Sequence, residues 1–253
     1  MTDRLRIILR SVNHRASWAI SRFAKWPVAH VIGFPKSGTT WVTQLVSAAT
    51  ELPYYRDTIW PVIGPAVLHG HSVPDAGRPK TICVVRDCRD VMVSLYFHRL
   101  NEKGMDDPTL QTQDYVRNNL ADFIIEEAQR PKSVSVGWGT YYKPIFSGKV
   151  KNIPTIKYEN LLNDTFGELT PAMEKALIPF DSNKLEEGIK YFSFKAAVNK
   201  TKNNREQRFL RKGVAGDWCN YFNKRTARVV HELFGDAMAA LGYENDNTWT
   251  KQI

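Results

Sequence analysis

Residues 33–41 form a glycine-rich segment whose side chains are typical of an anion-binding loop. The segment reads GFPKSGTTW and directly follows an apolar run. A nucleotide P-loop has the pattern G-x-x-x-x-G-K-[ST], with its lysine directly after the second glycine. Gly33 and Gly38 have this spacing, but Thr39 follows Gly38 and the lysine, Lys36, lies inside the loop. The segment therefore predicts a phosphate-binding turn that departs from the nucleoside-triphosphate pattern.

Hydroxyl residues around the second glycine support this interpretation. Backbone N–H groups at a helix start point at an anion, and the helix dipole adds to the attraction. Ser37, Thr39 and Thr40 add hydroxyl donors, and Lys36 can reach an anionic oxygen. The alternative is a plain strand-to-helix turn. The convergence of one lysine and three hydroxyls on one helix start favours the anion site.

A second candidate anion site lies at residues 84–99, VVRDCRDVMVSLYFHR. Arg86 ends a predicted strand, and Ser94 follows eight residues later, about two turns into the next predicted helix. Arginine presents a planar fork that suits phosphate oxygens. The alternative is a surface charge cluster that caps the helix, made of Arg86, Asp87, Arg89 and Asp90.

A third basic segment, RKGVAGDW, occupies residues 211–218. Arg211 and Lys212 supply positive charge, and glycines such as Gly213 allow the backbone to approach an anion closely. A basic surface turn is the alternative interpretation of this segment taken alone.

The three segments together resemble the cytosolic-type sulfotransferases. PKSGTTW is similar to the family's 5′-phosphosulfate-binding loop, the Arg86–Ser94 spacing to its 3′-phosphate motif, and RKGVAGDW to its R-K-G-x-x-G-D-W segment. These matches follow the family's order and span residues 33–218. The resemblance implies a P-loop-related α/β fold. It also implies 3′-phosphoadenosine 5′-phosphosulfate (PAPS) as the sulfuryl donor and adenosine 3′,5′-bisphosphate (PAP) as the product.

The resemblance also implies a set of donor-binding residues. Trp41 and Phe194 would stack on either side of the adenine, with core packing as the alternative, and Tyr158 matches the family's adenine-contacting tyrosine. Lys36 would neutralise the charge that develops on the leaving 5′-phosphate, where electrostatic stabilisation helps most. The donor needs no metal, and the sequence suggests no ligand cluster. The implied donor-binding residues are Lys36, Ser37, Gly38, Thr39, Thr40, Trp41, Arg86, Ser94, Tyr158, Phe194, Arg211, Lys212 and Gly213.

Transfer to a hydroxyl or amine needs a base, and we expect His71 to supply it. Its segment, LHGHSVP, resembles the family's K-T-H strand, whose histidine deprotonates the acceptor. Histidine accepts a proton near working pH at modest cost. His69 stands where the family has a lysine, and one residue is inserted before Pro74. His69 is therefore the rival base, and a purely structural role for both histidines is the third interpretation.

The pattern along the chain predicts one α/β domain over residues 1–253, with a central parallel sheet, helices on both faces and a P-loop-like strand-loop-helix. Short apolar runs alternate with helical periodicity, which is typical of such sheets. Asn223 is expected to cap the last helix, which stops at Gly242. Strands are expected at 29–34, 66–72, 81–86 and 153–158, and helices at 38–49, 88–100, 112–129, 133–147, 167–178, 182–191 and 223–241.

Residues 1–26 predict a basic amphipathic helix. Its apolar residues recur at helical spacing, and cations mostly occupy the other positions. One interpretation is contact with an anionic membrane. The other is a helix whose apolar stripe packs on the domain. The apolar residues are Leu5, Ile8, Leu9, Val12, Ala16, Ala19, Ile20 and Phe23, and the cations are Arg4, Arg6, Arg10, Arg15, Arg22 and Lys25.

Composition limits the partners and the compartment that are expected for this protein. The net charge of +9 favours anionic partners. Three cysteines indicate a reducing compartment, and no apolar run reaches the roughly 18 residues of a membrane span. We expect a cytoplasmic enzyme, membrane-peripheral if the first helix binds lipid, and no nucleic-acid partner. The alternatives are a P-loop kinase or NTPase, for which Gly-Lys-Thr is missing, and a non-catalytic nucleic-acid-binding protein.

The acceptor is expected to be a small molecule, a sugar or a lipid-linked compound. Residues 51–80 and 101–111 should line its pocket. The vertebrate dimer motif K-x-x-x-T-V-x-x-x-E is not present, because Cys219, Asn223, Lys224 and Arg228 occupy its positions. An aromatic wall for the acceptor is expected from Tyr54, Tyr55, Trp60, Trp138, Tyr141 and Tyr142.

Overall fold

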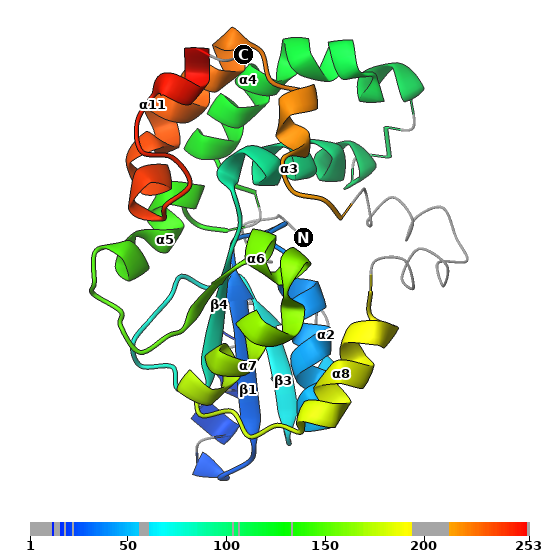
Figure 1. The fold of residues 1–253 in the computed structure, drawn as a ribbon, viewed down its shortest axis with the longest axis vertical. Helices are drawn as coiled ribbons and strands as arrows, with labels where there is room; N and C mark the ends of the chain where they lie inside the picture. Colours follow the sequence, from blue (N-terminus) through cyan, green and yellow to red (C-terminus); the bar gives the residue numbers. More distant parts are fainter. Residues whose placement is uncertain are drawn as a thin grey trace.

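A five-stranded, fully parallel sheet forms the centre of the protein (Figure 1). The computed structural model describes residues 12, 16–17, 19–21, 23–55, 61–102, 104–105, 107–132, 134–193 and 213–251. The strand order is β2-β3-β1-β4-β5. The strands are β1 (Val28–Gly33), β2 (Tyr54–Tyr55), β3 (Ala66–Gly70), β4 (Thr81–Val85) and β5 (Thr155–Lys157). The expected strands are confirmed, and the two-residue β2 lies in a stretch for which only loop was expected.

Successive residues of the central strands belong to two separate hydrophobic clusters. Val31 and Val84 pack into one cluster with α2 (Thr39–Thr50), α7 (Thr165–Lys175) and α8 (Ser182–Tyr191). Ile32 and Cys83 pack into the other with α3 (Cys88–Glu102), α4 (Gln113–Gln129), α5 (Trp138–Phe146) and α11 (Lys224–Ala240). Successive side chains of a strand point to opposite faces of the sheet. Both faces are therefore covered, which explains why these strands are continuous apolar runs and confirms the expected layers.

The helices agree with the sequence pattern in type and differ mainly at their ends. Asn223 caps α11 by accepting a 2.9 Å hydrogen bond from the Thr226 N–H, and Gly242 follows the helix with φ 69°, both as expected. The short α6 was not predicted. The helices are α2 (Thr39–Thr50), α3 (Cys88–Glu102), α4 (Gln113–Gln129), α5 (Trp138–Phe146), α6 (Tyr158–Asn163), α7 (Thr165–Lys175), α8 (Ser182–Tyr191) and α11 (Lys224–Ala240), with 3₁₀ turns η1 (Pro108–Gln111), η2 (Asp217–Asn220) and η3 (Thr248–Lys251).

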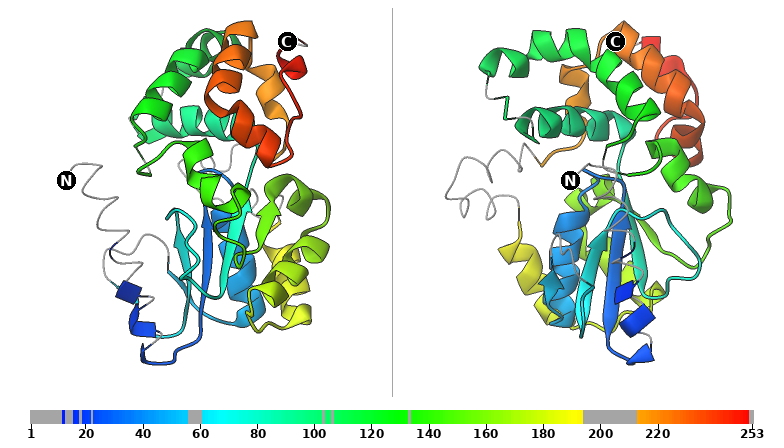
Figure 2. Two further views of the ribbon diagram at one scale, coloured as in Figure 1. Left: turned by 90° about the vertical axis from the view of Figure 1, so that its left-hand side faces the viewer. Right: turned by 180° about the vertical axis from the view of Figure 1, so that it is seen from behind.

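The carboxyl ends of β1 and β4 point towards α3 and the helices that surround it (Figures 1 and 2). β1 leads to α2 and then to β2 and β3 on one side, whereas β4 and β5 lie on its other side. Such a reversal of strand order is where open parallel sheets bind ligands, outside the carboxyl ends of the strands. The segments at residues 33–41 and 86–94 both begin there.

Part of the N-terminal segment is described. Its buried side chains are polar and its most exposed ones are apolar, which is the reverse of a helix that packs its apolar stripe on the domain. Residues 12, 16–17, 19–21 and 23 are helical. Ser17 and Ser21 are buried, and Ser17 Oγ accepts a 2.8 Å hydrogen bond from the Val62 N–H. Val12 is 55% exposed and Phe23 94% exposed. These apolar side chains do not pack on the domain. In the described part of the chain, no helix is long and apolar enough to cross a membrane.

Candidate active site

The loop between β1 and α2 is shaped by two glycines that no other residue could replace without displacing a neighbour. A Cβ on Gly33 would lie 2.6 Å from both Thr39 Cγ2 and the Val84 carbonyl oxygen. Gly38 has φ 87°, and a Cβ there would lie 2.5 Å from Cδ2 of Tyr158. Among the described residues, no side chain caps the start of α2 at Gly38. The loop therefore presents an uncapped helix start, which is suited to an anion.

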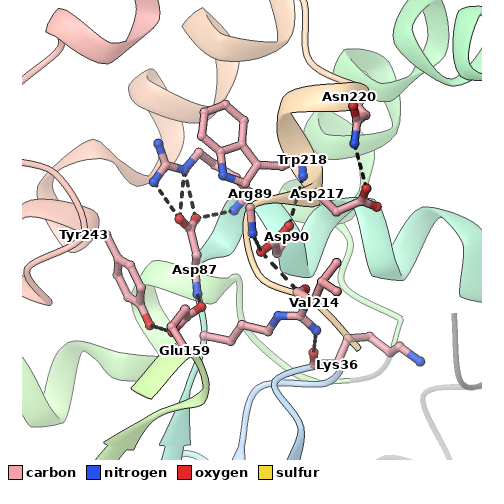
Figure 3. A network of polar contacts seen from close by, with 12 residues as sticks. Lys36, Asp87, Arg89, Asp90, Glu159, Val214, Asp217, Trp218, Asn220 and Tyr243 are labelled. Atoms are coloured by element: carbon pink, nitrogen blue, oxygen red, sulfur yellow. Dashed lines mark hydrogen bonds and ion pairs between the residues drawn. The ribbon is translucent and has the colours of Figure 1, made fainter. Parts of the chain in front are cut away.

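Lys36 and Ser37 occupy different environments within this loop. Lys36 has φ 71°, which lies in the left-handed region that residues other than glycine rarely adopt. Figure 3 shows its ammonium group directed away from the surrounding network of buried charges. Ser37 is buried, and its Oγ lies 3.3 Å from the hydroxyl of Tyr142 inside the protein. The lysine is thus the side chain that leaves the loop, while the serine joins the loop to the core.

Arg86 brings all three sequence motifs together. Its guanidinium donates to the carbonyl oxygens of Lys36 (3.2 Å) and Val214 (3.0 Å), and it lies 4.3 Å above the ring of Tyr158. Asp90 lies 3.9 Å from it. The Nε atom of Arg86 is buried and has no hydrogen-bond partner among the described residues. An orphaned donor of this kind indicates an anionic ligand or a water at this position.

Asp90 connects the start of α3 to the 213–218 segment. Its carboxylate accepts hydrogen bonds from the backbone N–H groups of Gly216 (2.7 Å) and Trp218 (3.0 Å). Burial raises the pKa of Asp90, and the charge of Arg86 opposes that shift. Ser94 lies one helical turn beyond Asp90, on the same side of α3. Gly213, with φ 64°, is the described part of the R-K-G triplet, whereas Phe194, Arg211 and Lys212 lie outside the described residues.

A network of buried charges packs against the 213–218 segment at Trp218 (Figure 3). The guanidinium of Arg89 points at the carboxylate of Asp87, at 2.6 Å. It also lies 2.5 Å from the carboxylate of Glu244. The same guanidinium lies over the rings of Trp218, at 4.1 Å, and Trp249, at 4.9 Å. The acidic and basic residues at 86–90 are thus buried rather than a surface cluster. Glu244, Trp218 and Trp249, which enclose Arg89, lie far away in the sequence, which is why local pattern did not predict this role.

Glu159 extends the network to the end of β5. Its carboxylate accepts a 2.9 Å hydrogen bond from the Asp87 N–H and a 3.0 Å hydrogen bond from the Tyr243 hydroxyl. Burial raises its pKa. The adjacent Tyr158 contacts Trp41 edge to face, with 6.1 Å between ring centroids. Two of the three residues expected at the adenine are therefore neighbours.

His71 and His69 lie beside the β1–α2 loop. His71 Nδ1 lies 2.8 Å from the Gly33 carbonyl oxygen, which only accepts hydrogen bonds, so Nδ1 carries the proton. In the neutral ring, the basic lone pair is then on Nε2. His69 Nε2 lies 2.9 Å from Thr39 Oγ1, and the two imidazole rings are nearly perpendicular, with 5.0 Å between centroids. The structure thus brings both candidate bases next to the loop, and their roles in the chemistry stay predictions.

The expected aromatic wall is only partly consistent with the structure. Trp138, Tyr141 and Tyr142 are fully buried members of the hydrophobic core, so their expected role as an acceptor wall was wrong. The hydroxyls of Tyr141 and Tyr142 donate to the carbonyl oxygens of Ser72 and Val84, which explains how these polar groups are accommodated inside. Tyr54 and Tyr55 form β2, with Tyr55 exposed, and Trp60 lies outside the described residues.

The site contains no metal cluster within the described residues. No group of three or more histidine, cysteine, aspartate or glutamate side chains there has the arrangement of a metal site. Cys83 and Cys88 are buried and Cys219 is exposed, all three as free thiols.

Known proteins resemble this chain over most of its length. A family model described as a sulfotransferase domain matches residues 66–242. The chain is 23% identical to sulfotransferase 6B1 of Danio rerio, over 83% of this chain and 77% of that protein. It is 24% identical to sulfotransferase 2B1 of Mus musculus, over 82% of this chain and 70% of that protein.

Solved structures share the fold. Mouse sulfotransferase SULT7A1, crystallised with PAP, superposes with a TM-score of 0.58 at 19% identity and covers 84% of each chain. Retinol dehydratase in a complex with retinol and PAP gives a TM-score of 0.59 at 17% identity, covering 83% of this chain and 81% of that chain.

Proposed function

The chain belongs to the sulfotransferase domain family, and we propose that its site transfers a sulfuryl group from PAPS to a hydroxyl or amine of an acceptor. The observation that carries the proposal is the position of Arg86, which contacts both the Lys36 backbone and Val214 and so joins the three motifs. A polyanionic donor with phosphate at both ends of its ribose needs such adjacent cationic sites. A P-loop kinase or NTPase is not favoured, because Lys36 precedes Gly38 instead of following it.

The donor site is assembled from residues that fit a nucleotide with two anionic groups. The uncapped start of α2, with Thr39 and Thr40, would hold the 5′-phosphosulfate. Arg86, through its orphaned Nε, and Ser94 would hold the 3′-phosphate together with Arg211, Lys212 and Gly213. Trp41, Tyr158 and Phe194 would contact the adenine.

The transfer step uses Lys36 and His71. The acceptor oxygen forms a bond to sulfur while the bond from sulfur to the bridging oxygen of the 5′-phosphate breaks. The acceptor proton passes to Nε2 of His71, the nitrogen that carries the basic lone pair when Nδ1 donates to the Gly33 carbonyl oxygen. The electron pair of the broken bond stays on the leaving 5′-phosphate, where the Lys36 ammonium balances the added charge. No metal is needed for this step.

The acceptor is proposed to be presented at a membrane surface. Val12, Ile20 and Phe23 have a spacing that places them on one side of an α-helix, and all three are exposed. Residues 1–26 combine this surface with the anion-attracting residues Arg4, Arg6, Arg10, Arg15, Arg22 and Lys25, against the single acid Asp3. Apolar side chains flanked by cations favour an anionic lipid surface. This supports a lipid-linked or membrane-dissolved acceptor over a freely diffusing sugar.

Co-sedimentation with lipid vesicles tests the membrane proposal. We expect the protein to sediment with vesicles containing phosphatidylserine and to stay in solution with phosphatidylcholine alone. Phe23→Glu should abolish sedimentation. Leu177→Glu, which changes an exposed leucine outside the N-terminal segment, should leave it unchanged. Equal sedimentation of the two variants would show that the helix does not make the contact.

Calorimetric titration with PAP tests the donor proposal. We expect PAP to bind tightly, and 5′-AMP, which lacks the 3′-phosphate, to bind at least about tenfold more weakly, because charge-assisted hydrogen bonds to that phosphate are lost. Magnesium-ATP serves as the control for an NTPase. Preference for magnesium-ATP, or no binding of PAP, would overturn the assignment of the donor.

A further inference from the structure

We propose that His69 is a positioning residue that directs the hydroxyl of Thr39 towards the donor's 5′-phosphate. The proposal rests on the proposed function, because it takes Thr39 as part of the donor site. It assigns a role to the histidine that occupies the position of the family's lysine.

The contact between the two side chains is direct and partly buried. His69 Nε2 lies 2.9 Å from Thr39 Oγ1, and Thr39, the first residue of α2, is buried. His69 is paired with Val31 in the parallel register of β3 and β1, so its backbone is fixed beside the strand that leads into the loop. The rings of Tyr54 and His71 flank the imidazole, at centroid distances of 6.4 Å and 5.0 Å.

The direction in which the Thr39 hydroxyl donates its proton depends on whether Nε2 of His69 carries a proton. A threonine hydroxyl has one proton and two lone pairs. If His69 Nε2 accepts, that proton points at the histidine, and only lone pairs face an anion at the helix start. If Nε2 carries a proton, Thr39 accepts from it and its own proton is directed at the anion. A bound phosphate therefore selects the donating form of His69, and the two hydrogen bonds strengthen each other.

Histidine at position 69 is suited to this role. A lysine ammonium only donates hydrogen bonds, as does an imidazole nitrogen that carries a proton. The segment resembles the family's K-T-H strand but has histidine where the lysine stands. Position 69 thus keeps a side chain that can donate a hydrogen bond.

A double-mutant cycle on PAP affinity tests the proposal, with His69→Leu and Thr39→Val as the two changes. We expect His69→Leu to raise the Kd for PAP about tenfold, because it removes the donor behind a hydrogen bond to a charged group. In the Thr39→Val background, the same change should alter the Kd by less than about twofold, because the hydroxyl is gone. Effects that add independently would overturn the proposal.

Two further variants separate positioning from a structural role. Thr43→Val removes a hydroxyl one turn along α2 that bonds to the Thr39 carbonyl and not to His69, so its effect should add to that of His69→Leu. His69→Gln retains an N–H donor and should bind PAP within about threefold of the wild type. Should His69→Leu fail to fold, a large loss of affinity in a folded His69→Gln would itself overturn the proposal. Failure of the wild-type protein to bind PAP would instead contradict the proposed donor.

Discussion

Asp90 accepts a 2.7 Å hydrogen bond from the backbone N–H of Gly216, a residue 126 positions further along the chain. It accepts a second hydrogen bond from the Trp218 N–H and lies close to Arg86. One carboxylate thereby fixes the 213–218 segment against the start of α3, next to the arginine expected to bind the 3′-phosphate.

Asp90→Ala should weaken PAP binding by at least about tenfold and lower the Tm. The change leaves two inward-facing N–H groups without their acceptor, which costs about 1–3 kcal/mol for each group. Calorimetry and thermal unfolding measure the two effects. Asp122→Ala, which breaks an exposed ion pair with Arg225, is the matched control and should leave both unchanged. An unchanged Kd in Asp90→Ala would contradict the role of the 213–218 segment in donor binding.

Lys36→Gly should lose most turnover while gaining stability. Lysine at φ 71° carries a backbone cost of about 1–2 kcal/mol that glycine does not have. Urea unfolding should therefore give Lys36→Gly a larger free energy of unfolding than Lys36→Ala, while both variants lose turnover alike. A turnover near that of the wild type in either variant would exclude Lys36 from the transfer step.

His71→Ala should abolish transfer and leave PAP binding unchanged. The imidazole is expected to take the acceptor proton and makes no expected contact with PAP. Rate measurements with any acceptor that supports turnover, paired with calorimetry, separate the two functions. His69→Ala should show the opposite pattern, with a weakened PAP affinity. If His69→Ala abolished turnover at saturating donor and His71→Ala did not, the choice of base would be wrong.

Glu159→Gln should change the pH dependence of stability. Burial raises the pKa of Glu159 in the folded protein. A carboxyl with a raised folded pKa stabilises the fold fully below its unfolded pKa, and this stabilisation is lost as the pH rises through the folded value. The wild type should therefore lose stability relative to Glu159→Gln as the pH rises above about 4.3, the ordinary pKa of a glutamate. Urea unfolding at several pH values measures the difference. A difference that does not vary with pH, or that grows in favour of the wild type as the pH rises, would contradict this account.

The order of strands and helices was predictable because buried parallel strands are short apolar runs between helices. The exceptions have local causes. Residues of β2 pair only at Tyr54 and Tyr55, too few to leave a pattern, and α6 is a single short segment directly after β5. α5 begins at Trp138, later than expected, because Gly137 adopts the extended backbone conformation that precedes the helix.

The candidate site was predictable where one motif holds both the backbone geometry and the chemistry, as at Gly33–Thr39. It was not predictable where the partners are distant in sequence. Arg89 pairs with Glu244, 155 residues away, and its guanidinium lies over the rings of two tryptophans of the C-terminal region. Nothing near residue 89 reveals that its charge is buried. Trp138 and Tyr141 illustrate the opposite error, since aromatic residues near a predicted pocket were core residues.

The joining of three remote segments by Arg86 and Asp90 has a consequence for how this enzyme fails. A binding site confined to one hairpin could survive in a proteolytic fragment, but this site requires the ends of β1 and β4 and the 213–218 segment at once. Loss of any one of these segments removes hydrogen-bond partners from at least one of the other two. Donor affinity is thus a reporter of cooperative folding, and heat inactivation of the enzyme tracks the melting of the whole assembly.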